Sequence, residues 1–559
     1  MHILWLDLNC SYVHSSLALP ALHAQVKHRT DVNWEVVRAT TNEQIDVVTN
    51  AIYEHRPDVV AASAWLFTHE YLLHIIARVK ALLPQTTVIL GGPEFLGNNE
   101  TYLRHHTEID CVLRGEGEES FARWLDVWHS PSAWSDIPGL CYIERNEYEH
   151  NDLKGPEEIS PTPYHDNGLA RVADFASLHA PEESTFFAWD KPFVQLETTR
   201  GCFNSCAFCV SGIGDPIRTL PLDVIRSRLD RIREHGIRDV RILDRTFNYN
   251  SQRAIALIQL FTEYHPYLRF HLEIHPALLT APLRDILVTL PIGLLHMEAG
   301  IQSLRQDVLD SCLRKGTLSS ALEGLSFLCS QKNLVTHADL IAGLPLYSLA
   351  HIYEDIHTLA EYKADEIQLE LLKLLPGTTM RNKAEKRGIR YSPMPPYEVL
   401  EADSISSIEL QEARRLSRLL DAYYNTTAWQ QITRQLILEE AGFLNKFLHY
   451  LTAHNYIDQP MSLERRGELL YIFCKEHYPA YTTAVAIAWI EAGMSLKKRP
   501  AERVHTRQIL PPNEWIILYG EYTENLRLCF LPTDDNGHGY WFGHDTTKQQ
   551  PKPTFKAKG

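Results

Sequence analysis

The chain has 559 residues, enough for about three or four domains at roughly 150 residues each. Apolar residues make up 45% of it and charged residues 22%, which is typical of globular proteins and excludes a disordered, a collagen-like or a small disulfide-stapled protein. The formal net charge is −16. Because proteins dedicated to nucleic acids or anionic membranes need a basic face, this charge argues against both kinds of partner.

Residues 1–10 carry no Lys or Arg and include Asp7, so we do not expect them to be a signal peptide. The longest uncharged run, residues 8–26, is interrupted by two histidines, Pro20 and several serines, and it would make a poor membrane span. Ten cysteines are too few for a disulfide scaffold in a chain of this length. We therefore expect a cytoplasmic protein without a membrane segment.

Residues 1–130 alternate short apolar runs with helical patterns. The predicted strands are residues 2–6, 34–37, 58–62, 87–90 and 110–113. Apolar residues at three- and four-residue spacing between them indicate amphipathic helices. Strands that alternate with helices form right-handed βαβ units, so we predict a doubly wound, Rossmann-like parallel sheet. Such sheets bind ligands beyond the carboxyl ends of their strands, which predicts a ligand crevice there.

Residues 131–190 are rich in Pro, Asp, Glu and Ser, with only weak strand signals such as residues 140–143, and we interpret them as a connector. Alternation resumes in residues 191–380, where six predicted strands are spaced at about 30 residues, the length of one βα unit. These strands are residues 193–198, 239–244, 269–274, 294–300, 336–342 and 366–372. Six units are too few for an eight-stranded barrel, so we predict a partial (β/α)6 TIM-like barrel.

Residues 381–559 change to a mainly α-helical pattern. A short strand pair is predicted near residues 515–522 and 525–531, and a Lys/Pro-rich tail from residue 549 is predicted to be disordered. The predicted fold class is therefore α/β for the two domains in residues 1–380, followed by a helical carboxyl-terminal domain.

Three of the cysteines, Cys202, Cys206 and Cys209, lie close together directly after the first predicted strand of the second domain. Three thiolates at this C-x3-C-x2-C spacing can converge on one metal centre, and soft sulfur ligands suit zinc or iron–sulfur sites. A structural zinc site needs a fourth Cys or His at short spacing, whereas the next histidine along the chain is His235. Three cysteines on a four-iron cluster leave one iron open for another ligand. Three buried thiols, or a zinc site with a distant fourth ligand, remain the alternatives.

With the aromatic Phe208 just before its last cysteine, this loop resembles that of the radical S-adenosylmethionine (SAM) superfamily. The resemblance implies that the three cysteines are the catalytic metal ligands of a [4Fe–4S] cluster whose fourth iron binds SAM. One-electron reduction would cleave SAM to a 5′-deoxyadenosyl radical, which abstracts hydrogen from the substrate, while the protein orients the reactants and excludes solvent. The position after a barrel strand agrees, since α/β barrels hold their active sites there.

Further matches to the superfamily follow along the second domain. The implied SAM-binding residues are Phe208, Asp244, Glu273, Gln302, Ser303, Arg314 and Gly343. Gln302 and Ser303 lie in a G-x-Q-S turn, and Gly343 lies in a segment similar to the adenine contact of the superfamily. SAM needs acceptors for its ammonium group, a cation for its carboxylate and polar partners for its ribose, and these residue types supply them. For each residue alone, an ordinary core or surface role is an equal alternative.

Two short motifs lie at the expected crevice of the first domain. Ser63-Ala64-Trp65 and Gly91-Gly92, with Ser63 and Gly91 28 positions apart, resemble the S-x-L … G-G spacing of cobalamin-binding domains. The resemblance implies that the serine caps the buried nucleotide tail of cobalamin and that the glycines let the backbone approach it closely. Trp65 stands in place of the Leu of that pattern.

His14 stands where the D-x-H-x-x-G loop of cobalamin-binding domains places its cobalt ligand, but Tyr12 and Leu17 replace the Asp and the Gly. Since a ligating histidine usually needs an acceptor for its second nitrogen, a structural role for His14 is the alternative to axial ligation. Glu116 lies in an R-G-E-G-E segment (residues 114–118) that resembles one in radical SAM proteins with this domain, which implies a cobalamin contact. An acidic helix start is the alternative there, and a generic nucleotide-binding or flavodoxin-like domain is the alternative for residues 1–130.

The order of domains resembles that of cobalamin-binding radical SAM proteins, in a subgroup with a carboxyl-terminal helical extension of unknown function. The resemblance implies three cofactors, namely a [4Fe–4S] cluster, SAM and cobalamin. In the first hypothesis the protein cleaves SAM reductively and methylates an unactivated carbon of a small molecule or peptide. The one-electron donor would be a protein such as flavodoxin or ferredoxin.

Other hypotheses remain open. A methylthiolase-like, RNA-modifying radical SAM enzyme would use the arginines of residues 218–245 as a phosphate-binding face. Acidic residues interleave with these arginines, which favours a solvated helix, and Cys10, Cys111 and Cys141 are too far apart in sequence to form a second cluster site. The remaining hypotheses are a non-methylating rearrangement enzyme with the same cofactors, and a cobalamin or redox sensor with a structural cluster.

Overall fold

The computed structural model describes residues 1–144, 162–212, 216–494, 505–506, 526–532, 539–545 and 555–558. The chain divides into two compact units. The first comprises Met1–Thr336, Gly343–Ser348 and Leu371–Ser407, and the second comprises His337–Ala342, Leu349–Glu370 and Ile408–Gly559.

The first sheet has seven strands in the order β2-β1-β3-β4-β5-β6-β7. They are β1 (His2–Asn9), β2 (Asn33–Thr40), β3 (Val59–Ser63), β4 (Thr87–Gly91), β5 (Cys111–Leu113), β6 (Leu140–Ile143) and β7 (Tyr164–Asp166). The first five strands pair in parallel, with Leu4 opposite Val60 and Val60 opposite Val88, so the predicted parallel sheet is confirmed. The strands β2 and β3 flank β1 on opposite sides, which is the switch point where sheets of this kind bind ligands.

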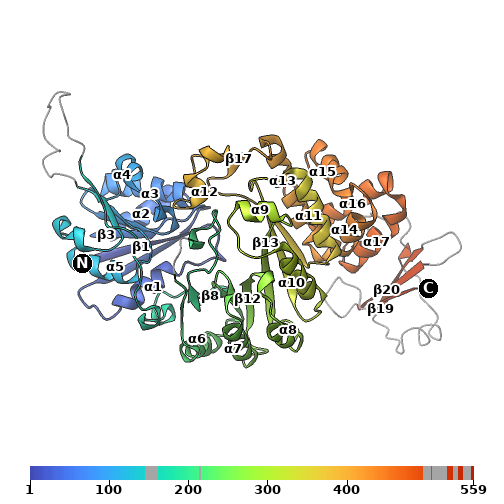
Figure 1. Ribbon diagram of the computed structural model, residues 1–559, viewed down its shortest axis with the longest axis horizontal. Helices are drawn as coiled ribbons and strands as arrows, with labels where there is room; N and C mark the ends of the chain where they lie inside the picture. Colours follow the sequence, from blue (N-terminus) through green and yellow to red (C-terminus); the bar gives the residue numbers. More distant parts are fainter. Residues whose placement is uncertain are drawn as a thin grey trace. The chain divides into compact units, whose positions relative to one another are not determined.

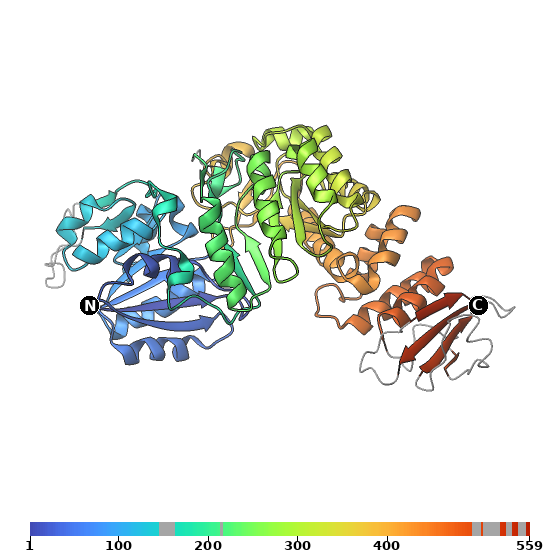
Figure 2. The same cartoon turned by 90° about the horizontal axis from the view of Figure 1, so that it is seen from below.

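Helices cover both faces of this sheet (Figures 1 and 2). On one face lie α2 (Ile45–His55), α3 (His69–Leu82) and α4 (Glu100–His105), and on the other lie α1 (Ala18–Val26) and α5 (Glu118–Val127). Successive side chains of a strand point to opposite faces, and accordingly Leu4 packs with the first group of helices and Ile3 with the second. The continuous apolar run of β1 therefore fits a sheet that is covered on both sides.

The strands β6 and β7 extend this sheet beyond the predicted boundary at residue 130. They lie in the predicted connector, where β6 runs antiparallel to β5 and β7 antiparallel to β6. Leu140 and Cys141 of β6 are fully buried, so this pairing covers the edge of β5 with apolar side chains. The weak strand expected at residues 140–143 is β6. The three-residue strand β7 was not predicted, because so short a run gives little signal within a polar segment.

The second sheet has the strand order β15-β14-β13-β12-β11-β8, with β15 and β8 as its two edges. Its strands are β8 (Phe193–Leu196), β11 (Asp239–Ile242), β12 (Arg269–Ile274), β13 (Leu295–Gln302), β14 (Val335–Ala342) and β15 (Glu366–Leu371). The intervening helices are α6 (Leu222–Glu234), α7 (Ser251–Thr262), α8 (Ala281–Val288), α10 (Leu318–Ser330) and α11 (Leu349–Glu361). The ladders from β8 to β13 are parallel, and the six strands confirm the predicted partial barrel.

The carboxyl-terminal region is mainly helical, as predicted. Its helices include α13 (Ser407–Leu419), α14 (Thr427–Glu439), α15 (Phe443–Ala453), α16 (Leu463–His477) and α17 (Thr482–Glu491). Among the residues that the structure describes, no helix is long and apolar enough to cross a bilayer.

An antiparallel sheet follows these helices, in the order β18 (His505–Thr506), β19 (Leu526–Pro532), β20 (Gly539–Asp545) and β21 (Phe555–Lys558). The predicted strand at 525–531 corresponds to β19, whereas the predicted strand at 515–522 lies outside the described residues. The predicted disorder of the tail is wrong for β21, which pairs with β20 through Tyr540 and Lys558. Lys-rich composition concealed a four-residue strand whose partner supplies the hydrogen bonds.

Gly467 lies inside α16 against two buried tryptophans. A Cβ at this position would lie 2.4 Å from Trp429 Cη2 and 2.8 Å from Trp489 Cε3. Alanine stabilises an exposed helix by about 1 kcal/mol relative to glycine, but overpacking a buried site costs about 1–3 kcal/mol. We therefore expect Gly467→Ala to lower the midpoint of thermal unfolding, measured by circular dichroism. Glu476→Ala, at an exposed position of the same helix, is the control, and an unchanged midpoint in Gly467→Ala would contradict this packing.

Candidate functional site

A cavity of about 680 Å3 opens at the carboxyl edge of the first sheet. The ends of β3, β4 and β5 and the residues after them form one wall, and the segment after β8 forms another. The lining includes five of the six residues predicted to bind cobalamin, namely Ser63, Trp65, Gly91, Gly92 and Glu116. The crevice predicted from sheet topology and the motifs predicted from resemblance therefore coincide.

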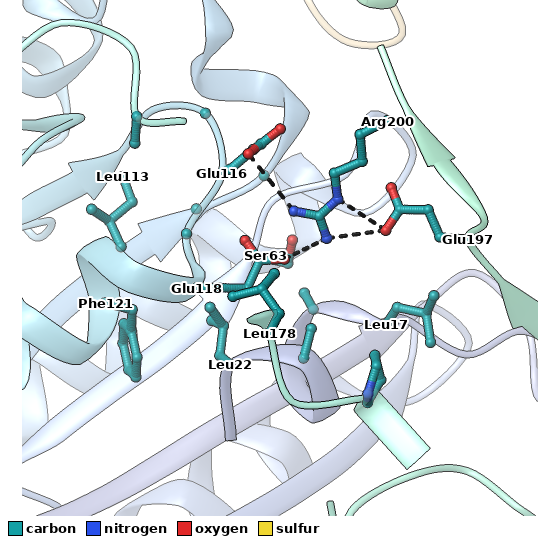
Figure 3. Close-up of a pocket in the computed structure, with 18 of the residues that line it drawn as sticks. Leu17, Leu22, Ser63, Leu113, Glu116, Glu118, Phe121, Leu178, Glu197 and Arg200 are labelled. Atoms are coloured by element: carbon teal, nitrogen blue, oxygen red, sulfur yellow. Dashed lines mark hydrogen bonds and ion pairs between the residues drawn. The ribbon is translucent and has the colours of Figure 1, made fainter. Parts of the chain in front are cut away.

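Apolar side chains line much of the cavity (Figure 3). They include Leu17, Leu22, Leu113, Phe121 and Leu178. A concave, mainly apolar pocket with a few polar groups is the usual form of a cofactor or small-molecule site, and its volume falls in the usual range of about 300–1,000 Å3.

Gly92 brings the ends of β3 and β4 into close contact. Its φ is +108°, and a Cβ at this position would lie 2.7 Å from Ala64 O and 2.8 Å from Ser63 Oγ, so only glycine fits. Ala64 N donates a hydrogen bond to Gly91 O at 2.7 Å. On Gly91, by contrast, a Cβ would meet no heavy atom closer than 3.9 Å. Gly92 is thus required by packing, whereas Gly91 leaves open space at the cavity wall.

His14 is not among the described residues that line the cavity. It is exposed, its Nδ1 lies 2.7 Å from Ser11 Oγ, and its ring meets that of Phe193 edge-on with the centroids 6.2 Å apart. This placement favours the structural role over axial ligation of cobalt. Trp65, which replaces the Leu of the family pattern, does line the cavity.

Tight backbone contacts fix the start of the R-G-E-G-E segment. Gly115 has a φ of +101°, and a Cβ there would lie 2.4 Å from Ala170 O. The preceding residue, Arg114, forms an ion pair with Asp166 at 3.0 Å. Both partners belong to the predicted connector, which therefore takes part in shaping the cavity wall.

The two glutamates of the segment point to arginines of the second domain. Glu116 forms a bidentate ion pair with Arg218, at 2.8 Å and 2.5 Å, and accepts a hydrogen bond from Val172 N at 2.6 Å. Burial alone would raise the pKa of Glu116, but these hydrogen bonds hold it below its usual value. Glu118, in the first turn of α5, pairs with Arg200 at 2.6 Å. Glu116 therefore already has hydrogen-bond partners within the protein, and its contact with cobalamin stays a prediction.

Arg200 lies between three carboxylates in the cavity wall (Figure 3). Its Nη2 is 2.6 Å from Glu118 and 3.0 Å from Glu197, and its Nη1 is 3.8 Å from Glu116. Burial works against its charge, but the Glu118 and Glu197 carboxylates raise the pKa of Arg200 above its usual value. A permanently charged guanidinium therefore stands two residues before Cys202.

The three cysteines lie in one loop, residues 201–212, which we call the cysteine loop. The strands β9 (Thr199–Arg200) before it and β10 (Arg218–Thr219) after it form an antiparallel pair, with Arg200 opposite Arg218. We call this pair the stem. All three cysteines are free thiols; Cys206 is buried, and Cys202 and Cys209 are partly exposed. The cysteine loop therefore begins at the stem, where Arg200 and Arg218 lie opposite each other.

The thiols lie close enough to influence one another. Burial raises the pKa of Cys206, and Cys209 and Cys202 raise it further, whereas Arg314 acts in the opposite direction. Arg314 Nη1 lies 3.6 Å from Cys206 Sγ, and Cys202 Sγ lies 3.6 Å from Thr246 Oγ1. Three thiols with a guanidinium beside one of them suit a metal centre, because the cation would offset part of the negative charge that the sulfurs carry as metal ligands.

Segments distant in sequence hold the cysteine loop in place. Ala207 N donates to Cys312 O at 2.8 Å, and Met380 N donates to Ala207 O at 2.8 Å. The side chain of Asn204 accepts a hydrogen bond from Lys315 N at 3.0 Å. Residues 312–315 follow the short helix α9 (Gln306–Ser311), and Met380 belongs to α12 (Thr379–Asn382).

Asp244, one of the predicted SAM residues, has hydrogen-bond partners within the protein. Its side chain is fully buried, and its carboxylate accepts hydrogen bonds from Thr198 N at 2.8 Å, from Thr199 N at 2.9 Å and from the Thr198 hydroxyl. These contacts use both oxygens, and the contact of Asp244 with SAM stays a prediction. Asp244 fixes the backbone that leads from β8 into the stem.

Two of the predicted SAM residues, Gln302 and Arg314, lie together at Gly300. Arg314, which contacts Cys206, also donates through Nη2 to Gly300 O. Gln302 has a φ of +71°, and its Nε2 would lie 2.8 Å from a Cβ on Gly300. Gly300 is therefore the position where Gln302 and Arg314 converge.

The other predicted SAM residues are more dispersed. Glu273 faces Arg245 at 3.6 Å on β12, and burial raises its pKa. Ser303 is fully buried, and Phe208 is a partly buried member of the cysteine loop. Gly343 has a φ of +91°, which favours glycine at that position.

Sequence reasoning missed Arg200, Glu197 and Arg218. A usable signal was present, because Arg200 directly precedes the Gly201-Cys202 pair. The proposed phosphate-binding face of arginines is not supported, since most of these side chains have carboxylate partners. The pairs are Arg218–Glu116, Arg226–Glu263, Arg228–Glu182, Arg233–Asp230 and Arg245–Glu273.

Replacing Asp244 should reveal its positioning role. We expect Asp244→Ala to lose about 1–3 kcal/mol of stability, because it leaves buried donors of Thr198 and Thr199 unpaired, and Asp244→Asn to lose less. Burial raises the pKa of Asp244, so folding favours its acid form, and its contribution to stability falls as the pH rises through that raised pKa. Denaturant unfolding of wild type and Asp244→Asn from about pH 4 upward should show the variant gaining relative stability. A pH-independent difference would contradict this assignment.

Comparisons with protein families match three parts of the chain. Residues 7–125 match the B12 binding domain, residues 196–359 match the radical SAM superfamily, and residues 385–487 match a protein family of unknown function, DUF4080. The first two matches cover the two walls of the cavity. The predicted resemblance to cobalamin-binding radical SAM proteins is thereby confirmed.

Curated relatives and solved structures agree with these matches. The cobalamin-dependent radical SAM methyltransferase TokK of Streptomyces tokunonensis is 24% identical over 355 residues, 60% of this chain and 50% of TokK. The chain thus spans about half the length of the curated relatives it matches. The structure of the methyltransferase TsrM from Kitasatospora setae, with cobalamin and a [4Fe–4S] cluster bound, is similar with a TM-score of 0.54 at 16% identity, covering 70% of this chain and 78% of TsrM.

The cobalamin-dependent SAM radical enzyme OxsB, with aqua-cobalamin and SAM bound, is similar with a TM-score of 0.60 at 11% identity, covering 89% of this chain and 82% of OxsB. At these identities the structural likeness concerns the fold. The chain therefore combines, in this order, a B12-binding domain, a radical SAM domain and a DUF4080 region.

Proposed function

We propose that this protein is a cobalamin-dependent radical SAM enzyme that methylates an unactivated carbon of a small molecule or peptide. One observation carries the proposal: Arg200 and Gly201, at the start of the cysteine loop, line the same cavity as Ser63, Gly91 and Gly92. A cofactor held by the loop and a cofactor held by the sheet edge would therefore be neighbours.

The cysteine loop is suited to an iron–sulfur cluster. Cys202, Cys206 and Cys209 would be its ligands, since thiolates are the usual ligands of such clusters and three of them leave one iron free. When bound, the cluster supplies the electron that cleaves SAM, and cobalamin carries the methyl group that is transferred. Arg314 places a cation beside Cys206, and with Gln302 it is our candidate for the SAM side of the site.

The cavity is suited to a large, partly apolar cofactor. Gly91 leaves space at its wall, and Ser63 stands beside Gly92, where its hydroxyl can meet a ligand group. The leucines and Phe121 of the lining exclude water from one side of the cavity. Exclusion of solvent protects a reactive radical from side reactions.

The names of the relatives support the substrate class. TokK and 2-(S-pantetheinyl)-carbapenam-3-carboxylate methyltransferase are methyltransferases, and the latter is named for a small molecule. For this chain we propose a small-molecule or peptide substrate, a flavodoxin or ferredoxin as electron donor, and the reducing environment of the cytoplasm, which suits its free thiols. The carboxylate partners of the arginines at 218–245 disfavour the RNA-modifying alternative.

Anaerobic purification with cobalamin present tests the cofactor set. We expect about four irons per chain together with about one cobalt, and an electron paramagnetic resonance signal that SAM perturbs. Cys206→Ala should lose the iron and the reductive formation of 5′-deoxyadenosine while retaining cobalt. Background cobalt in the wild type would remove the methylcobalamin mechanism, and the absence of a SAM-sensitive signal would remove the radical mechanism.

The exposed position of His14 predicts that it does not ligate cobalt. We expect His14→Ala to bind cobalamin with wild-type stoichiometry and with an unchanged optical spectrum, because the side chain is not part of the cavity lining. Gly92→Val is the matched contrast, since its side chain would collide with Ser63 and Ala64 and should reduce cobalt content. A shifted cobalamin spectrum in His14→Ala would contradict this prediction.

A further inference from the structure

The glutamates of the R-G-E-G-E segment contact both strands of the stem. Glu116 holds Arg218 of β10 with two hydrogen bonds, and Glu118 holds Arg200 of β9 at 2.6 Å. Because β9 and β10 pair only through residues 199–200 and 218–219, the stem is short. Each of its two arginines is therefore held twice: by a glutamate of the first domain, and by the pairing of its own strand with the other strand of the stem.

These contacts are largely shielded from solvent. The side chains of Arg200 and Arg218 are 14% and 17% exposed, and those of Glu116 and Glu118 are 20% and 8% exposed. Charge-assisted, bidentate pairs in such surroundings are directional and stronger than exposed ion pairs. Arg218 also donates to Val172 O at 2.7 Å, which adds a fixed point on the segment that follows the first sheet.

The same residues form part of the cavity surface. Glu116, Gly117 and Glu118 line it from one side, and Arg200 and Gly201 line it from the other, whereas Arg218 is not among the lining residues. A molecule that fills the cavity would thus touch the groups that hold the stem. Arg218 offers a way to disturb the stem without changing the cavity wall.

We propose that Glu116 is a positioning residue for the cysteine loop: through Arg218 it holds the stem against the cavity wall, so that filling the cavity with cobalamin orders the loop. This inference rests on the proposed function, in that cobalamin occupies the cavity and the loop carries the cluster. Since binding free energies are reciprocal, an ordered loop also favours occupation of the cavity. The charge of the segment then serves the protein's own arginines and not only the cofactor.

The reactivity of the loop thiols tests this proposal without enzyme activity. The full chain, freed of iron by anaerobic chelation, is alkylated with iodoacetamide in the presence or absence of cyanocobalamin, and each cysteine is followed by mass spectrometry. Loss of a charge-assisted pair should raise the alkylation rate of Cys202 and Cys209 about tenfold in Glu116→Gln and in Arg218→Gln. The double variant should react no faster than either single variant, because both remove the same interaction.

Two controls isolate the effect. Glu119→Gln removes one charge from the first turn of α5, three positions after Glu116, and its loop thiols should react at the wild-type rate. Cys329 of α10, which is partly exposed like Cys202, should react at one rate in every variant. Cyanocobalamin should slow the alkylation of the loop in the wild type but not in Arg218→Gln, although both bind it.

Several results would overturn the proposal. These are unchanged loop reactivity in both single variants, an equal increase in Glu119→Gln, or additive increases in the double variant. Reaction of Cys111, which is buried in β5 of the same compact unit, would reveal a single variant that unfolds. In that case the exchanged pair Glu116→Arg/Arg218→Glu decides: slow alkylation supports the interaction and fast alkylation refutes it. If the wild type binds no cobalamin, the proposed function is refuted instead. The alkylation rates of wild type and variants without cobalamin then still test whether Glu116 and Arg218 hold the stem.

Discussion

The arrangement of the site depends on the ion pairs that the guanidinium of Arg200 forms. It forms ion pairs with Glu197, three residues earlier in the second domain, and with Glu118 at the start of α5. It lies two residues before the first cysteine. Shared between carboxylates of two domains, it couples the edge of one sheet to the first loop of the other. Without it, the buried carboxylate of Glu118 and the partly buried carboxylate of Glu197 would lose their cation, which is costly in surroundings of low polarity.

Buried ion pairs of this kind give specificity more than stability, because desolvation offsets much of their attraction. Two neighbouring arginines are likewise held by glutamates. Arg228 holds Glu182 with three hydrogen bonds in a fully buried position, and Arg218 holds Glu116. Glu182 and Val172 both belong to residues 162–190, so this segment carries polar contacts that align the two domains around the cavity.

The cysteine loop illustrates the same principle at the backbone level. Asp244 fixes Thr198 and Thr199 before the loop, Cys312 and Met380 fix Ala207 within it, and the loop contributes its thiols to a region where Arg314 supplies positive charge. A metal centre needs ligands held in position before it binds, since loose ligands must be ordered at the expense of affinity. Anchors from three separate segments, at residues 244, 312–314 and 380, meet this requirement.

The sequence by itself determined the parallel first sheet, the six-stranded second sheet and the location of the site. Apolar periodicity sets strand and helix, and the motifs around Ser63, Gly91 and Cys202 follow strand ends, which meet at one edge of a parallel sheet. The tertiary structure alone decided that Asp244 is a buried anchor, that His14 stays outside the cavity, and that Glu116 and Arg218 meet across 102 positions of sequence. The reason is physical: periodicity reports on which face a residue occupies, whereas the partner of a charged or polar side chain depends on which distant segments packing brings beside it.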